Sequence, residues 1–117
     1  MSQNALLFEM LMVGYVHKQR NAAEKIMNDE KKMLHIERMT ENLPVLRSKL
    51  AVTQSELGDR IGVSRHTLIA LENRQRVMTW NMYLSLLFIF LSNEGTKKLL
   101  EALDICDDDL MNFIAFR

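Results

Sequence analysis

The 117-residue sequence contains few of the residues that interrupt helices, with one proline and four glycines. It also lacks the alternating apolar and polar runs that are typical of β-strands. Leu, Met, Glu, Lys and Arg, which favour helices, are plentiful. We therefore expect an all-α fold, in a chain long enough to form one domain with extensions around a buried core.

Cysteine is almost absent, since Cys106 is the only one. An internal disulfide is therefore excluded, which favours a reducing cytoplasm as the location. We interpret Cys106, next to the apolar Ile105, as a small core residue rather than a redox sensor.

A long hydrophobic run is also lacking. Residues 5–16, ALLFEMLMVGYV, are apolar, but they are too few to span ~30 Å of hydrocarbon, and Glu9 lies near their middle. No basic N-terminal region or small-residue cleavage site marks a signal peptide. These absences predict a soluble, cytoplasmic protein with no membrane partner.

The charges balance overall but are unevenly distributed. Residues 43–92 carry six basic and three acidic side chains, a net of +3, whereas residues 93–117 carry three basic and six acidic, a net of −3. A positive excess confined to one segment suits binding to phosphates.

The sequence shows no pattern of an enzyme, a metal site or a cofactor site. His17, His35 and His66 are scattered, without metal-ligand spacing or a cysteine partner. There is no phosphate-binding glycine loop and no nucleophile near a base. The three aspartates at 107–109 are interpreted as the charged start of a helix rather than a cation site.

The most specific pattern runs over residues 53–73, TQSELGDRIGVSRHTLIALEN. Thr53 and Glu56 form the spacing of a capping box, which predicts the start of a helix. Gly62 predicts a left-handed exit from that helix, and Ser64 is a suitable cap for the next one. Two short helices joined by a tight glycine turn are typical of a helix-turn-helix.

This motif resembles that of the lambda-repressor-like (XRE-type, Cro-like) family of bacterial and phage DNA-binding proteins. The resemblance covers residues 42–104 and implies a helix-turn-helix domain of about five helices. It is carried by Thr53-Gln54, Leu57-Gly58, Gly62-Val63-Ser64 and Glu72-Asn73. The chain departs from the family with Gly58 in place of Ala, Arg74 in place of Gly and Met78 in place of Pro. We interpret Gly58 as harmless for packing, at about 1 kcal/mol of helix propensity, and expect the loop after the second helix to follow another path.

We expect three segments. Residues 1–41 form an N-terminal helical arm for oligomerisation, with breaks near Asn21 or at Asn28-Asp29. Residues 42–104 form the DNA-binding domain, whose first helix starts at Asn42 with Pro44 in its first turn. Residues 105–117 end in a short amphipathic helix. A helix over residues 79–91 is apolar on all sides, so the arm, the C-terminal segment or a second subunit must cover it.

The docking geometry of such motifs assigns the recognition helix to the residues after Ser64, with its N-terminal part facing the bases. Arg65 is suited to donate two hydrogen bonds to a guanine. The resemblance implies that Gln54 holds a phosphate, with the residues of the following loop on the DNA backbone. The predicted DNA-binding residues are Gln54, Ser64, Arg65, His66, Thr67, Ile69, Ala70, Asn73, Arg74 and Arg76.

These observations predict a sequence-specific transcriptional regulator, a repressor that binds double-stranded DNA. One recognition helix contacts few base pairs, so we expect a homodimer on a two-fold operator. Residues 5–16, 79–91 and 110–116 offer the apolar surface for dimerisation. The alternative is an antitoxin-like interaction module that sequesters a partner protein and binds DNA for autoregulation.

Overall fold

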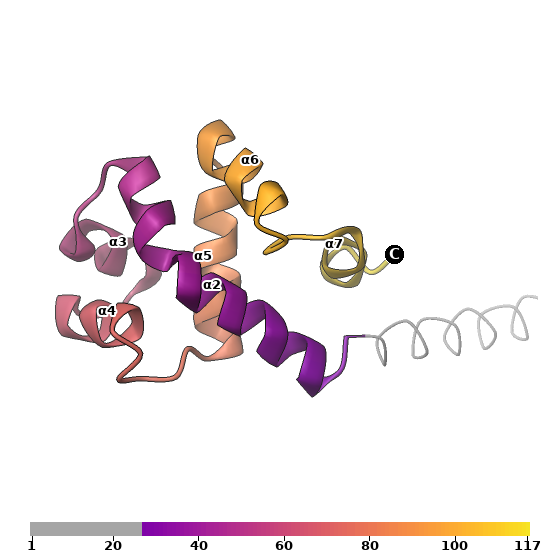
Figure 1. Cartoon of the computed structure of the whole chain (residues 1–117), viewed down its shortest axis with the longest axis horizontal. Helices are drawn as coiled ribbons and strands as arrows, with labels where there is room; N and C mark the ends of the chain where they lie inside the picture. Colours follow the sequence, from indigo (N-terminus) through magenta and orange to yellow (C-terminus); the bar gives the residue numbers. More distant parts are fainter. Residues whose placement is uncertain (1–26) are drawn as a thin grey trace, which may run out of the picture. The chain divides into compact units, whose positions relative to one another are not determined.

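The computed structural model describes residues 27–117, and all the regular structure in this part is helical (Figure 1). The predicted all-α class is therefore confirmed. The helices are α2 (Asp29–Leu50), α3 (Gln54–Ile61), α4 (Arg65–Glu72), α5 (Trp80–Leu91), α6 (Glu94–Ala102) and α7 (Asp108–Ile114). The chain divides into two units, one of residues 32–107 and the other of residues 1–31 with 108–117.

Helix α2 begins at one of the breaks that the sequence indicates. The Asn28 side-chain oxygen accepts a hydrogen bond from the Lys31 backbone N–H at 3.0 Å, and Asp29 follows as the first helical residue. An Asn at this place satisfies one of the unpaired N–H groups of the first turn. The apolar run at 5–16 and the predicted break near Asn21 lie outside the described residues.

The predicted helix start at Asn42 is wrong, because α2 continues through Pro44. The proline removes one backbone hydrogen bond and costs about 3 kcal/mol in a helix interior. Each large apolar side chain buried on the same helix contributes about 1.5–3 kcal/mol, and the series crosses the proline at helical spacing. Its members are Ile36, Met39, Leu43 and Leu46. Their combined burial outweighs the cost of Pro44, whereas Met33 and Leu34, also on α2, are exposed.

The turn between α3 and α4 has the predicted construction. Thr53 and Glu56 form a reciprocal capping box, with N–H to oxygen distances of 3.1 and 3.2 Å. Gly62 ends α3 at φ +77°, a left-handed conformation that is costly for other residues. Ser64 caps α4 by accepting from the Thr67 backbone N–H at 3.1 Å. Local sequence signals thus fix both helix starts and the turn.

Gly58 has a role that the sequence interpretation missed. A Cβ atom at this position would lie 2.8 Å from the carbonyl oxygen of Val63, closer than real Cβ contacts. The Val63 N–H also donates to the Gly58 carbonyl at 2.9 Å. The absence of a side chain therefore allows the turn to lie directly on α3, and Gly58 is a packing requirement rather than a harmless replacement.

Within residues 32–107, α5 packs against both α3 and α6, and α3 packs against α4 (Figure 1). Thr79 caps α5, which buries Tyr83, Leu86, Leu87 and Phe90. The expectation that α5 is apolar on all sides holds only in part, because its exposed residues are the polar Asn81 and Ser85 together with Phe88. Phe88 is 73% exposed.

The segment after α6 is held by its backbone. The Ile105 carbonyl oxygen accepts hydrogen bonds from Nδ1 of the buried His35 at 3.3 Å and from the Tyr83 hydroxyl at 2.9 Å. Arg38 donates to the Asp104 carbonyl at 2.9 Å. Burial raises the pKa of Tyr83. Cys106, interpreted above as a core residue, is half-buried.

In the other unit, the aspartates at the start of α7 lie as the sequence predicts. Asp108 and Asp109 occupy the first turn of α7, where carboxylates interact favourably with the helix dipole. Asp109 also lies 3.8 Å from the Lys31 ammonium. Among residues 27–117, no helix has the length and apolar character needed to cross a membrane.

Candidate nucleic-acid interface

The first turn of α4 presents polar side chains at the surface. Arg65 and His66 are exposed, and Ser64 precedes them as the exposed cap. Leu68 and Leu71 are fully buried and hold the opposite side of the helix against the core. The remaining predicted contact residues of α4, Thr67, Ile69 and Ala70, are half-buried. The buried leucines on the opposite side of α4 therefore hold its exposed start in place.

The loop after α4 returns to the start of that helix. The Gln75 and Arg76 backbone N–H groups donate to the Ala70 carbonyl at 2.9 and 3.2 Å. The Arg76 side chain then donates to the Thr67 hydroxyl at 3.4 Å, and this hydroxyl lies 3.1 Å from the Ser64 hydroxyl. A guanidinium nine residues further along the chain is therefore added to the polar end of α4.

Arg74 takes a different direction from Arg76. Its backbone has φ +60°, the left-handed conformation, at the position where the resembled family commonly has glycine. Its guanidinium lies 2.6 Å from the Glu37 carboxylate of α2, a hydrogen bond that raises the pKa of Arg74. Asn73, the cap at the end of α4, is exposed. The structure thus brings Arg76 to the start of α4 and pairs Arg74 with α2.

Gln54 belongs to a partly buried network that sequence analysis missed. Its amide nitrogen donates to Glu72 at 2.8 Å, and Arg47 donates to the other carboxylate oxygen of Glu72 at 2.6 Å. The Glu72 side chain is 6% exposed. Arg47 also donates to the Val52 carbonyl at 3.1 Å, so the network joins the end of α2, the start of α3 and the end of α4. The sequence did contain a signal for this network, because Arg47 and Glu72 each follow a core leucine by four residues and so lie on the same side of their helices as the core.

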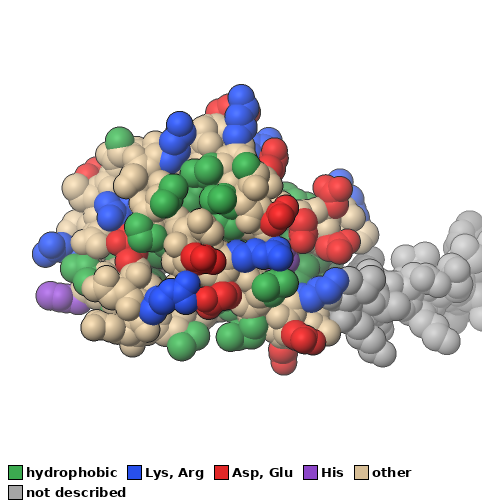
Figure 2. Space-filling model, viewed as in Figure 1, with side chains coloured by type: hydrophobic (Ala, Val, Ile, Leu, Met, Phe, Trp, Pro, Cys, Tyr) green, Lys and Arg blue, Asp and Glu red, His purple; other side chains and the backbone are tan. Residues whose placement is uncertain are grey.

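Ion pairing leaves the positive charge of this region concentrated at α4. Within the described residues, Arg47, Arg60 and Arg74 each pair with a carboxylate, whereas Arg65 and Arg76 belong to none of the ion pairs. By contrast, acidic and basic side chains alternate on the face that carries α2 (Figure 2). The start of α4 is therefore better suited to phosphates than the α2 face.

Other kinds of site find no support in the described part of the chain. No group of three or more His, Cys, Asp or Glu side chains in residues 27–117 is arranged to hold a metal ion. Comparison of the chain with protein-family models, with curated proteins and with solved structures gave no match.

Proposed function

We propose that the protein is a sequence-specific DNA-binding regulator, a repressor with a lambda-repressor-like helix-turn-helix that binds its operator as a homodimer. The observation that carries this proposal is the convergence of Arg65, His66 and Arg76 at the exposed start of α4. The helix follows a tight turn and has a buried rear side, as a helix that enters the major groove requires.

In this proposal the start of α4 contacts base edges and its surroundings contact phosphates. Arg65 donates to the O6 and N7 atoms of a guanine, while Ile69 and Ala70 lie one turn further along for contact with a thymine methyl. Gln54 uses one amide hydrogen on Glu72 and has a second for a phosphate at the start of α3. Arg76 adds a positive charge for the backbone.

A homodimer follows from the small size of the contact surface. A single recognition helix contacts few base pairs, and two such helices separated by about 34 Å bind successive major grooves on one side of the duplex. Each half-site then adds its own discrimination, which raises the specificity above that of one copy.

The proposal is tested by selecting bound sequences from a random DNA library with the intact protein, Arg65→Ala and Arg65→Lys. Arg65→Ala should weaken binding to the preferred site by about 1–3 kcal/mol and relax the preference at one base position. Arg65→Lys keeps the charge but lacks the two-donor fork, so it should retain more affinity and still relax that preference. Lys98→Ala, on the exposed side of α6, is the control for the loss of one positive charge.

Two outcomes would count against the proposal. Selection that enriches no sequence from the library would remove sequence-specific binding altogether. A preferred site that is unchanged in both Arg65 variants would show that the start of α4 does not contact the bases.

A further inference from the structure

Arg74 has a backbone conformation that is unusual for its residue type. Its φ of +60° lies in the left-handed region, which costs an arginine free energy that a glycine avoids. The chain is fixed there by hydrogen bonds from the Asn73 N–H to the Ile69 carbonyl at 2.9 Å and from the Arg74 N–H to the Leu71 carbonyl at 3.2 Å. A long side chain at a strained backbone position indicates that the side chain has a function.

Two carboxylates of α2 act on the Arg74 guanidinium. Glu37 accepts a hydrogen bond from Arg74 Nη1 at 2.6 Å, and Glu41 follows one turn later on the helix. Glu37, through this hydrogen bond and its charge, and then Glu41, through its charge, raise the pKa of Arg74. The side chains of Arg74 and Glu37 are 50% and 59% exposed, so their pair is weak and a second anion can compete for the arginine.

Arg74 lies close to the side chains that we propose for DNA. It precedes Arg76 by two residues, so the two Cα atoms are at most about 7 Å apart. The Arg76 side chain reaches Thr67 in the first turn of α4. Along one DNA strand a phosphate follows about every 3.4 Å of the helix axis, so a backbone that meets Arg76 presents further phosphates nearby. Rotation of the Arg74 side chain alone, with the loop backbone unchanged, then suffices for a phosphate contact.

We propose that Glu37 is a further determinant of DNA affinity, because it holds Arg74 on α2 and thereby removes one phosphate contact from the interface. This inference rests on the proposed function, since it requires DNA at the start of α4. Each phosphate bound by a lysine or an arginine releases counterions, which adds about 0.9 to the slope of log affinity against log salt. Each copy of the intact protein therefore binds DNA with one contact fewer than its arginines allow.

The test measures the affinity for a duplex with the site that the intact protein selects, and for a mixed-sequence duplex of equal length, between about 50 and 200 mM salt. Glu37→Gln should bind both duplexes more tightly at low salt and steepen the slope by about 0.9 per copy. Its advantage over the intact protein should then fall by about 3.5-fold per copy across this salt range. The base preference should not change, because phosphates carry no sequence information.

A double-mutant cycle with Arg74→Gln separates the phosphate contact from the change in charge. With Glu37 present, Arg74→Gln should change the slope little, because the arginine is already held on α2. In the Glu37→Gln background it should remove the whole gain of about 0.9 per copy. A simple charge effect would instead be equal in both backgrounds.

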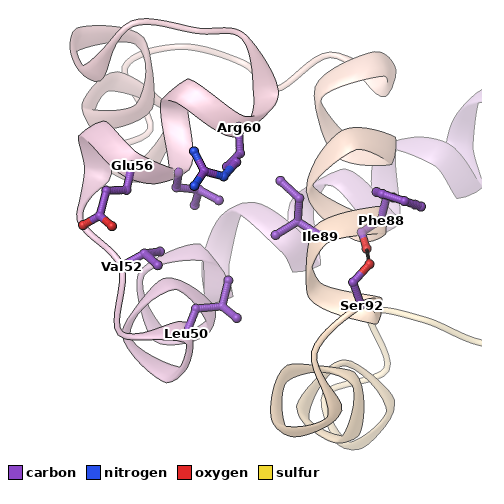
Figure 3. A pocket seen from close by; sticks show the side chains of 8 residues that line it. Leu50, Val52, Glu56, Arg60, Phe88, Ile89 and Ser92 are labelled. Carbon is purple, nitrogen blue, oxygen red and sulfur yellow. Dashed lines mark hydrogen bonds between the residues drawn. The ribbon is translucent and has the colours of Figure 1, made fainter.

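Two charge-matched variants are the controls. Glu41→Gln removes the same charge from the same helix but leaves the hydrogen bond between Glu37 and Arg74 intact. Asp59→Asn releases Arg60 from an exposed pair of 3.1 Å on α3. Arg60 borders a hollow of about 340 Å³ that is lined by the end of α2, by α3 and by α5, and not by α4 (Figure 3). Both variants should leave the slope unchanged.

The possible failures of the inference and of the proposed function differ. An equal effect of Arg74→Gln in both backgrounds, or no effect in either, would overturn the inference and leave the proposed function standing. A slope that Glu41→Gln steepens as much as Glu37→Gln would overturn it as well, because the charge of α2 would then be sufficient. If neither the intact protein nor Glu37→Gln binds either duplex, the proposed function fails and the inference with it.

Discussion

The buried pair between Arg47 and Glu72 should contribute far more to stability than an exposed pair of equal length. Arg47 and Arg74 both lie 2.6 Å from a carboxylate, that of Glu72 and that of Glu37 respectively. The Glu72 side chain is 6% exposed, whereas that of Glu37 is 59% exposed. We predict that Glu72→Gln destabilises the protein strongly and that Glu37→Gln has no measurable effect on stability.

The expected loss in the free energy of unfolding for Glu72→Gln follows from the hydrogen-bond partners that lose the carboxylate. Removing one member of a buried ion pair costs about 3–5 kcal/mol. Two features reduce the loss here, because the Arg47 side chain is 21% exposed and keeps its bond to the Val52 carbonyl. A Gln side chain also retains one acceptor oxygen, and in the intact protein a single oxygen of Glu72, Oε2, accepts from both Arg47 and Gln54. We therefore expect a loss of about 2–3 kcal/mol in the free energy of unfolding.

Urea unfolding followed by circular dichroism measures this difference, with the slope m checked for constancy between variants. The melting temperature of Glu72→Gln should fall by about 8–12 °C, at roughly 4 °C per kcal/mol for a domain of this size. Equal stability losses in Glu72→Gln and Glu37→Gln would refute the reasoning, because burial would then not determine the strength of these pairs.

Three further changes have defined outcomes. Raising the pH above about 10 should lower the free energy of unfolding. The pKa of Tyr83 is raised in the folded state, so above this pH the unfolded chain loses a proton that the folded protein keeps. In Tyr83→Phe this part of the pH dependence should be absent. Gly58→Ala should cost about 1 kcal/mol, since the clash with the Val63 carbonyl exceeds the gain in helix propensity; a more stable variant by thermal melting would contradict the close approach. Arg76→Ala should weaken binding to all DNA sequences nearly equally and reduce the slope of log affinity against log salt by about one unit; a changed base preference would assign Arg76 to the bases instead.

The parts of the structure that sequence analysis predicted depend on residues close together in the chain. Thr53 with Glu56, Gly62 and Ser64 specify caps and a turn within a few residues, and all of them are found as expected. The exposure of Arg65 follows from the same local pattern, because the positions of buried leucines on α4 determine which side faces solvent.

The parts that it missed depend on contacts between distant residues. Pro44 suggested a helix start because its local cost is visible in the sequence, while the burial that compensates for it appears only in the folded chain. The clash that Gly58 avoids and the pairing of Gln54 with Glu72 likewise join separate helices. Residue identity alone gives no distance for such contacts.

The attachment of the segment after α6 has a consequence for how this region tolerates substitution. His35, Arg38 and Tyr83 bind carbonyl oxygens of Asp104 and Ile105, so the contact depends on the path of the main chain there. The Asp104 side chain takes no part in these bonds, but its φ of +55° restricts the position to residues that accept a left-handed backbone, such as Asn and Gly. Homologous chains should therefore vary at position 104 within this small group while they keep all three donors. Replacing the peptide bond after residue 105 by an ester, whose carbonyl is a weaker acceptor, would weaken the hydrogen bonds from His35 and Tyr83 at once without changing any side chain.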